Sequence, residues 1–280
     1  MQKTKYAVIG SDVSKSLSPR MQMAAFKHHK LPNTYEALSI PPNEFNERMS
    51  SLIKEYAGLN VTIPYKEKAL DFVGAPSPLV TKLHALNTLK FDWNAIYGEN
   101  TDVDGLMTAI SAAGYGVSPD ASAFMIGAGG AARATIEALT SFGVKGFTVA
   151  GRSSQRVSEF ESWFKHYYPD FSLKMVPFDS KEAWITGIRD AQLFVNSVPN
   201  DVYHEILFSS EIQFSHNVLV IDWNYLPKMT HWIKKALAVK GTPVYGYEIL
   251  LYQGAKSFTF WTKLEAPVSI MKNALLEELI

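Results

Sequence analysis

The sequence predicts an α/β protein of two domains. Its 280 residues are more than one core of ordinary size organises. Short β-rich runs alternate with helical patterns along nearly the whole chain, which is typical of parallel sheets covered by helices. In the second half, a glycine-rich turn at residues 127–132 stands between an apolar strand and a helix. We expect the first domain at residues 1–104 together with 249–280, and the second at 105–248.

The first half contains three β-rich runs separated by helices. We expect strands at residues 6–10, 34–40 and 58–63, and helices at 19–30, 43–54 and from about 66. Residues 87–100 hold two strand-like pieces around Asp92, Trp93 and Asn94, which predicts a hairpin added to the parallel sheet. A helix over 103–113 then leads into a Gly/Ser/Pro-rich stretch at 113–122, which is typical of a boundary between domains.

The second half repeats the alternation and predicts a doubly wound sheet. Six strands are expected, at residues 122–127, 146–152, 173–178, 191–199, 217–225 and 242–246. Helices are expected between them, including 131–142 and 155–166. From about Ile249 the chain predicts two helices with no strand between them, and we expect these helices to pack back on the first domain.

The composition excludes several classes of protein. The chain is 47% hydrophobic and has 27 basic and 27 acidic residues, so no global charge attracts nucleic acid or an anionic membrane. It has no cysteine, which excludes disulfides, thiolate metal sites and cysteine nucleophiles. The seven histidines include no H-E-x-x-H pattern, and we expect no metal. No apolar run has the length of a signal-peptide core or a membrane span, so we expect a cytoplasmic protein.

The glycine-rich turn predicts a dinucleotide site. Residues 127–132 match G-x-G-x-x-[GA] after a strand and before a helix. Gly127 allows a tight turn, Gly129 lets the backbone approach a pyrophosphate, and the amides at the helix start bind phosphate. The residues expected to hold the cofactor here are Gly127, Ala128, Gly129, Gly130 and Ala131. A Rossmann domain that binds a nicotinamide cofactor is typical of an oxidoreductase.

The end of the next strand favours NADP(H) over NAD(H). A carboxylate for the ribose 2′-hydroxyl is missing there, and Arg152, Ser153 and Arg156 follow the strand instead. Guanidinium and hydroxyl groups suit a 2′-phosphate. Alternatively, the two arginines only solvate the start of a helix, where the helix dipole slightly disfavours cations.

The first half carries polar residues at the ends of strands and in turns. Taken singly, each is more typical of a turn or a helix cap than of a site. Together, they would suit a small polyhydroxylated substrate that bears a carboxylate. These residues are Ser16, Ser18, Asn60, Thr62, Lys66, Asn87, Thr88, Asn100 and Asp102.

The ordered series of motifs resembles the shikimate dehydrogenase family over nearly the whole chain. The matching segments are Ser16-Leu-Ser18, 60–66, 85–88, 100–102, 127–131, 151–153, 222–227 and 246–253. The resemblance implies the reversible NADPH-dependent reduction of 3-dehydroshikimate to shikimate, in the biosynthesis of chorismate and aromatic amino acids.

The resemblance also implies roles for individual residues. Lys66 and Asp102 would be catalytic, and Ser16 and Ser18 would hold the substrate carboxylate. An ammonium at Lys66 could stabilise the negative charge that builds on the carbonyl oxygen and donate the proton. The ring hydroxyls would be bound by Thr62, Asn87 and Gln253. Tyr225 would contact substrate or cofactor, or alternatively would only pack at a strand end. Asn196, Ser197 and Ile249 would line the nicotinamide end, and Gly246 would also contact the cofactor.

Several positions depart from the family pattern. His84 replaces a glycine, which leaves the loop before Asn87 open to another path. The other departures are Lys15, Gln22, Met23, Val198, Asn200 and Ile249. They keep open a quinate/shikimate dehydrogenase with altered substrate or cofactor preference, and a catalytically weak sensor on the same fold. A methylenetetrahydrofolate dehydrogenase-like enzyme has a similar two-domain plan, but the serine pair and residues 100–102 do not suit it. A monomer and a homodimer both fit the composition.

Overall fold

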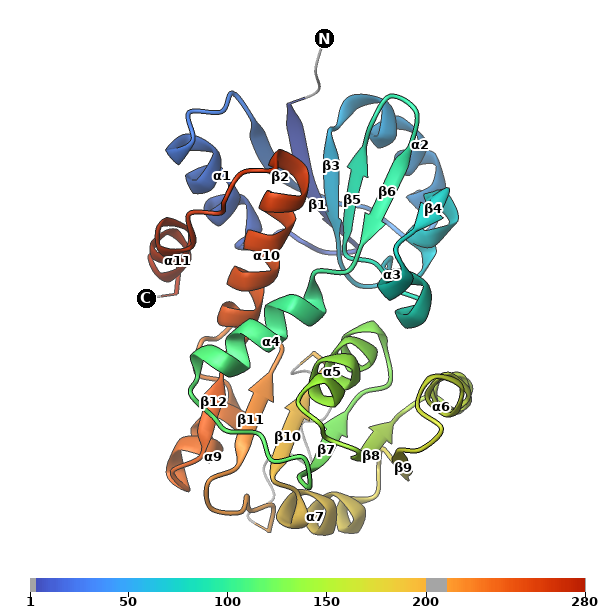
Figure 1. Ribbon diagram of the computed structural model, residues 1–280, viewed down its shortest axis with the longest axis vertical. Helices are drawn as coiled ribbons and strands as arrows, with labels where there is room; N and C mark the ends of the chain where they lie inside the picture. The colour runs from blue at the N-terminus through green and yellow to red at the C-terminus, as the bar shows by residue number, and fades with distance from the viewer. Residues whose placement is uncertain (1–3, 200–210, 280) are drawn as a thin grey trace. The chain divides into compact units, whose positions relative to one another are not determined.

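The computed structural model describes residues 4–199 and 211–279, and Asn200 lies outside these ranges. The chain divides into two compact units. Unit 1 comprises Met1–Gly105 and Leu250–Ile280, and unit 2 comprises Leu106–Ile249. Each unit has one six-stranded sheet with helices packed on it, so the protein is an α/β protein with a Rossmann-like second unit (Figure 1).

The sheet of unit 1 is mixed. Its strand order is β2-β1-β3-β5-β6-β4, in which β1, β2 and β3 are parallel and β5 runs antiparallel to β3 and β6. The strands are β1 (Lys5–Gly10), β2 (Thr34–Ser39), β3 (Gly58–Val61), β4 (Ala75–Pro76), β5 (Thr88–Phe91) and β6 (Ile96–Glu99). The predicted hairpin is confirmed, since β5 and β6 are antiparallel neighbours joined by Asp92, Trp93, Asn94 and Ala95.

Helices of unit 1 come from both ends of the chain. They are α1 (Ser18–His28), α2 (Phe45–Glu55), α3 (Pro78–Leu83), the start of α4 (Asp102–Ala112), most of α10 (Gly246–Thr262) and α11 (Val268–Leu276). The indole Nε1 of Trp261 donates to Leu89 O at 2.9 Å, and Arg20 pairs with Glu278 at 2.6 Å. The last helices therefore pack on the N-terminal sheet, as the sequence predicted.

The expected helix from residue 66 is wrong in type and length. The structure has a short 3-10 helix, η1 (Lys68–Phe72), followed by Gly74 and Pro76. A helix needs several residues to outweigh the cost of its first turn, and proline disfavours helical backbone at the residue before it. Helix α3 was missed, although Ser77 caps it by accepting from Val80 N and Pro78 starts it.

The sheet of unit 2 is entirely parallel, in the order β12-β11-β10-β7-β8-β9, which confirms the doubly wound sheet. Its strands are β7 (Ser122–Ile126), β8 (Gly146–Gly151), β9 (Ser172–Pro177), β10 (Leu193–Asn196), β11 (Leu219–Asp222) and β12 (Thr242–Val244). Its helices include α5 (Gly130–Ser141), α6 (Ser154–Tyr167), α7 (Lys181–Asp190) and α9 (His231–Ala238). The strand order reverses between β7 and β10, where such folds bind ligands.

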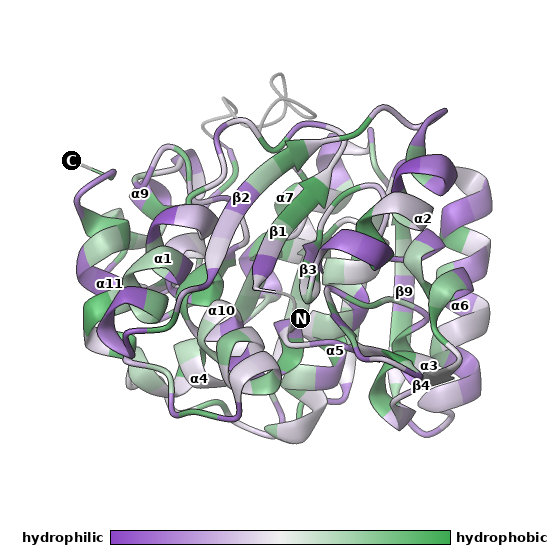
Figure 2. Cartoon of the chain, turned by 90° about the horizontal axis from the view of Figure 1, so that it is seen from above, coloured by the Kyte–Doolittle hydropathy of each residue, from purple (hydrophilic) through white to green (hydrophobic). Residues whose placement is uncertain are grey.

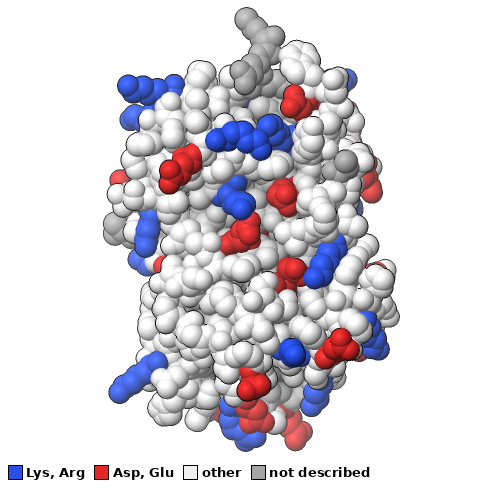
Figure 3. All heavy atoms as spheres, in the orientation of Figure 1, with Lys and Arg blue, Asp and Glu red and all other residues white. Residues whose placement is uncertain are grey.

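The distribution of polar and charged residues follows the layers. In Figure 2, β1 is mostly green, whereas α2 and α6 carry purple bands. On the face that Figure 3 shows, side chains of both charges are interspersed, in keeping with the zero net charge. None of the helices in the described ranges combines the length and hydropathy needed to cross a membrane. The same residues hold no group of three or more His, Asp or Glu side chains that could bind a metal.

Candidate active site

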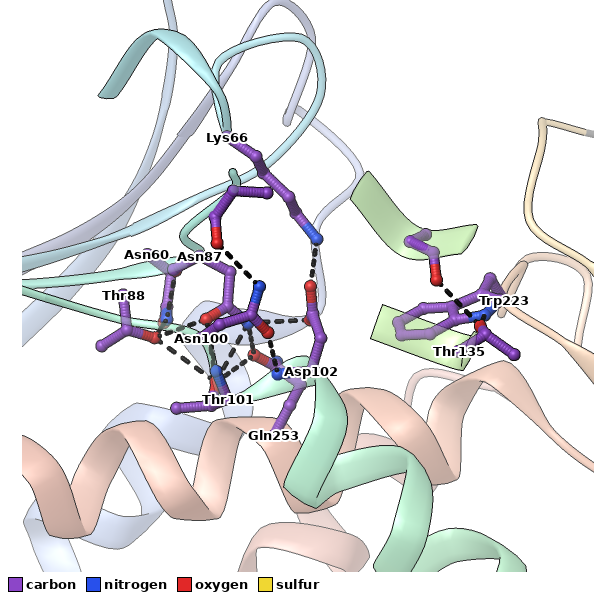
Figure 4. Close-up of polar contacts among 12 residues, drawn as sticks. Asn60, Lys66, Asn87, Thr88, Asn100, Thr101, Asp102, Thr135, Trp223 and Gln253 are labelled. Carbon is purple, nitrogen blue, oxygen red and sulfur yellow. Dashed lines mark hydrogen bonds and ion pairs between the residues drawn. The ribbon is translucent and has the colours of Figure 1, made fainter. Parts of the chain in front are cut away.

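Lys66 and Asp102 form an ion pair in unit 1. Lys66 Nζ lies 2.6 Å from Asp102 Oδ2, and the two side chains are 16% and 4% exposed (Figure 4). The loop that carries the lysine is anchored, because Leu86 N donates to Lys66 O at 2.9 Å. Asp102 is the first residue of α4, where the helix dipole favours a negative charge. The aspartate is therefore held inside the unit, and the lysine ammonium is the part that solvent or a ligand reaches.

Asn87 orients the Asp102 carboxylate. Its Oδ1 accepts from the backbone N–H of Thr101 at 2.8 Å. Because a backbone N–H can only donate, the amide oxygen must face Thr101 and the amide nitrogen must face the carboxylate. Asn87 Nδ2 donates to Asp102 Oδ1 at 2.7 Å, while Lys66 takes the other oxygen (Figure 4). Both carboxylate oxygens thus have a fixed donor.

Gln253 joins this group from helix α10. Its Oε1 accepts from Asn87 Nδ2 at 3.2 Å, and its Nε2 donates to Leu250 O at 3.0 Å. The backbone of α4 comes close enough to permit this, because Gly105 has no side chain. A Cβ on Gly105 would lie 2.7 Å from the Gln253 backbone nitrogen. The structure therefore brings together four predicted residues: Lys66, Asp102, Asn87 and Gln253.

Ser16, Ser18 and Thr62 lie near the carboxyl ends of the parallel strands β1 and β3. Ser16 Oγ accepts from Ser18 N at 3.3 Å, and Thr62 N donates to Ile9 O at 2.9 Å. Within the described residues, the hydroxyls of Ser18 and Thr62 have no hydrogen-bond partner. Ser18 is only 4% exposed, whereas Thr62 is partly exposed.

The loop before Asn87 keeps a backbone that glycine favours. His84 ends α3 with φ 49° and ψ 35°, in the left-handed region. Asn100 Nδ2 donates to Ala85 O at 3.0 Å and holds the next residue of the loop. His84 therefore adopts a backbone conformation that glycine reaches more easily.

The glycine-rich turn of unit 2 fits a pyrophosphate. Gly127 has φ 105°, and a Cβ on it would lie 2.5 Å from Ser197 Oγ. A Cβ on Gly129 would meet nothing within 4 Å, so a ligand can approach the backbone there. Gly129 precedes α5 and gives the helix no side-chain cap, which leaves the first amides of Gly130 and Ala131 for an anion.

The residues after β8 lie on the surface. Arg152, Ser153 and Arg156 are exposed. Ser153 caps α6, since its Oγ accepts from Arg156 N at 3.4 Å. Arg152 makes no ion pair or hydrogen bond with another described residue.

The residues expected near the nicotinamide have internal contacts. Asn196 is fully buried and donates from Nδ2 to Asp222 Oδ1 at 2.9 Å. Ser197 Oγ donates to Ile126 O at 2.7 Å, and Ile249 is 1% exposed. Gly246 lets the start of α10 approach Asn224, whose O would lie 2.4 Å from a Cβ on the glycine. Tyr225 is half-buried.

Sequence reasoning missed several buried polar residues in unit 1. Asn60 and Thr88 were noticed but given no role. Three others were not singled out: Tyr35, Thr101 and Ser257. Only Ser257 carried a usable signal, because it follows Gln253 by four residues and therefore shares its helix face.

A second missed group surrounds Asp222 in unit 2. Asp222 is fully buried and accepts from Thr230 Oγ1 at 2.6 Å and from Asn224 Nδ2 at 3.0 Å, besides Asn196. Burial raises the pKa of this carboxyl above its usual range. Next to it, the indole Nε1 of Trp223 donates to Thr135 Oγ1 at 3.0 Å and ties β11 to α5 (Figure 4).

Comparison with known proteins gives consistent results over nearly the whole chain. Residues 8–89 match the model of the shikimate dehydrogenase substrate binding domain, and residues 246–276 match that of the shikimate 5'-dehydrogenase C-terminal domain. The chain is 32% identical to a shikimate dehydrogenase (NADP(+)) of Nitrosopumilus maritimus, covering 97% of each chain. It is 33% identical to one of Methanopyrus kandleri, covering 97% of this chain and 94% of that protein.

A solved structure is also similar over nearly the whole length of this chain. The shikimate 5-dehydrogenase of Thermus thermophilus, in complex with NADP(H) and shikimate, superposes with a TM-score of 0.82 at 30% identity. The superposition covers 98% of this chain and 99% of that one.

Proposed function

The chain belongs to the shikimate dehydrogenase family, and from this we propose that it catalyses the reversible NADPH-dependent reduction of 3-dehydroshikimate to shikimate. The observation that supports this most directly is the arrangement of Lys66, Asp102 and Asn87. It offers one partly exposed ammonium beside a carboxylate whose two oxygens are already bound. The shikimate dehydrogenase substrate binding domain matches residues 8–89, which include Lys66 and Asn87.

Lys66 is the proton donor of the proposed reduction. As the substrate carbonyl becomes an alcohol, negative charge builds on its oxygen, and the ammonium stabilises that charge and donates a proton to the oxygen. The bound NADPH supplies the hydride. Asp102 holds the lysine in place and binds a substrate hydroxyl.

The other polar residues of unit 1 orient the ring. Ser16 and Ser18 hold the substrate carboxylate through their hydroxyls. Thr62, Asn87 and Gln253 hold the ring hydroxyls. Tyr225 is a further candidate for substrate binding. Hydroxyl and amide groups in fixed positions reduce the entropy lost when the reacting groups are aligned.

Unit 2 holds the cofactor. The turn from Gly127 to Ala131 binds the pyrophosphate, which the open space at Gly129 and the uncapped start of α5 support. Arg152, Ser153 and Arg156 bind the 2′-phosphate. Asn196, Ser197 and Ile249 line the nicotinamide end, and Gly246 is a further cofactor contact. In this proposal, the substrate domain consists of residues 1–104 and 249–280. The cofactor domain consists of residues 105–248.

The test is NADP+ reduction with shikimate, followed by NADPH absorbance, beside quinate and NAD+ in all four combinations. We expect rapid turnover of shikimate with NADP+. Faster turnover of quinate, or with NAD+, would instead support a quinate/shikimate dehydrogenase. Measurable NADPH binding with no turnover in any combination would overturn the proposal in favour of a sensor. We further propose a monomer or homodimer located in the cytoplasm, which sedimentation and cell fractionation test.

A further inference from the structure

Ser257 lies at the centre of the buried polar residues behind Asp102. It is fully buried on α10. Its Oγ lies 3.0 Å from Asn60 Nδ2, 2.8 Å from Thr88 Oγ1 and 3.2 Å from Thr101 Oγ1. These three partners come from β3, from β5 and from the residue before α4. One hydroxyl therefore links the returning helix to three segments of the N-terminal chain.

The donors and acceptors around Ser257 can be assigned. The carbonyl oxygen of Asn60 accepts from Tyr35 OH at 2.7 Å, so the Asn60 amide nitrogen faces Ser257 and donates to it. The Thr88 hydroxyl donates to Asn87 Oδ1 at 3.0 Å. Because a hydroxyl has one proton, Thr88 accepts from Ser257 when it donates to Asn87. The Ser257 proton has a second acceptor one turn earlier on α10, Gln253 O at 3.0 Å, and it can point to only one of the two at a time.

When the Ser257 proton points to Thr88, the hydrogen bonds all run in one direction. Donation passes from Tyr35 to Asn60, then to Ser257, to Thr88 and to Asn87. Asn87 donates in turn to Asp102 Oδ1, while Lys66 donates to the other oxygen (Figure 4). Hydrogen bonds aligned in this way polarise one another, and a buried chain of them fixes its members more strongly than isolated pairs do.

We propose that Ser257 is a positioning residue, which acts through Thr88 and Asn87 to hold the Asp102 carboxylate in place for Lys66. This inference rests on the proposed function and adds to it a residue that contacts neither substrate nor cofactor. Asn60 also reaches Thr88 directly, at 3.0 Å. Loss of the Ser257 hydroxyl therefore weakens this series of hydrogen bonds but does not interrupt it.

The experiment compares Ser257→Thr with Ser257→Val. The two variants have nearly the same volume and differ in the hydroxyl, so any effect of the added methyl group cancels. The threonine hydroxyl can adopt the required pose, because Thr262 and Thr135 already donate to the carbonyl four residues earlier in their helices. We expect kcat/KM for shikimate to be about fivefold to tenfold lower in Ser257→Val than in Ser257→Thr. The affinity for NADPH, measured by its fluorescence, should be the same in both.

Two further variants separate positioning from packing. In a Thr88→Val background, the difference between Ser257→Thr and Ser257→Val should largely disappear, because the link through which Ser257 acts is gone. Thr262→Val removes a hydroxyl from the same helix away from the chain and should leave kcat unchanged. Ser257→Ala, which adds no volume, should lower kcat/KM as Ser257→Val does.

The outcomes distinguish this inference from the proposed function. A wild-type protein without activity toward shikimate would overturn the proposed function. An active wild-type protein in which Ser257→Thr and Ser257→Val have equal kcat/KM would overturn the inference. Additive effects of Ser257→Val and Thr88→Val would do so as well, since Ser257 would then act by packing alone.

Discussion

Among residues 4–199 and 211–279, each unit contains one buried aspartate with several donors, and the two aspartates differ in a way that separates function from structure. Asp102 of unit 1 is paired with Lys66, whose ammonium is partly exposed. Asp222 of unit 2 is fully buried, and its hydrogen bonds in the described structure come from neutral donors only, Asn196, Asn224 and Thr230. The first carboxylate holds a partly exposed ammonium in place, whereas the second ties the loops that follow β10 and β11.

The two candidate binding regions differ in the same sense. In unit 1, buried side chains fix one another, and few of their polar atoms lack a partner. In unit 2, the helix start at Gly130 and Ala131 has no side-chain cap, and Arg152 is exposed. We therefore expect changes in unit 1 to affect kcat and changes in unit 2 to affect cofactor affinity.

Lys66→Ala should have the largest effect. Removing the proton donor should lower kcat by about 10² to 10⁴, the usual contribution of a general acid, while NADPH affinity stays unchanged. Lys66→Arg is the informative partner, because it keeps the ion pair with Asp102 but guanidinium does not release a proton. Steady-state kinetics of both variants test this. Full activity of Lys66→Arg would show that charge alone is needed.

Gly105→Ala should come next. Its Cβ would lie 2.7 Å from the backbone nitrogen of Gln253, so α4 and α10 must move apart and Gln253 must leave Asn87. We expect a stability loss of about 1 to 3 kcal/mol and a fall of roughly tenfold to a hundredfold in kcat/KM for shikimate.

Urea unfolding and kinetics measure both effects of Gly105→Ala. Gly116→Ala is the control, because its Cβ meets nothing within 4 Å. If Gly105→Ala is destabilised but keeps wild-type kinetics, then the close packing of α4 on α10 supports stability but not catalysis, and the prediction is wrong.

Arg152→Gln should affect the cofactor alone. If the guanidinium binds the 2′-phosphate, its loss should raise KM for NADP+ by about tenfold to a hundredfold. KM for NAD+ and kcat should change little. Arg189→Gln removes an exposed arginine of the same unit and should change neither KM. Equal losses for NADP+ and NAD+ would refute the role of Arg152 in selectivity.

Asp222 should make the stability of the folded protein depend on pH. Burial raises its pKa in the folded protein above the value of about 3.9 that it has when unfolded. Between these two pKa values the folded state binds more protons, so the contribution of Asp222 to stability falls as pH rises. The unfolding free energy of wild type, measured relative to that of Asp222→Asn, should therefore fall as pH rises above about 4.

Urea titrations across this range check the pH dependence, with the exposed Asp170→Asn as control. A difference that rises with pH would contradict the raised pKa.

The sequence predicted most of the fold and about half of the buried polar residues linked to Asp102. There is a physical reason why some features could be predicted and others could not. The strand, turn and helix around Gly127 are contiguous, so local signals sufficed there. Ser257 contacts Asn60 across 197 residues, and no local pattern reports such a contact. The prediction for residues 66–83 was wrong because the helices and the strand there are too short to show a periodic pattern of apolar residues.

His84→Gly should have the smallest effect and tests how far a sequence departure matters. A residue other than glycine in the left-handed region costs about 1 kcal/mol, and His84 has φ 49°. Glycine removes that strain but gains entropy in the unfolded chain, so the net stabilisation should lie between zero and about 1 kcal/mol.

Because the backbone already follows the path that glycine favours, Asn87 should stay in place and kcat should not change in His84→Gly. Lys30→Gly, at φ 54° on the end of α1, relieves the same strain elsewhere in unit 1 and is the matched control. A gain in kcat for His84→Gly alone would mean that the histidine side chain itself, rather than the loop backbone, limits the reaction.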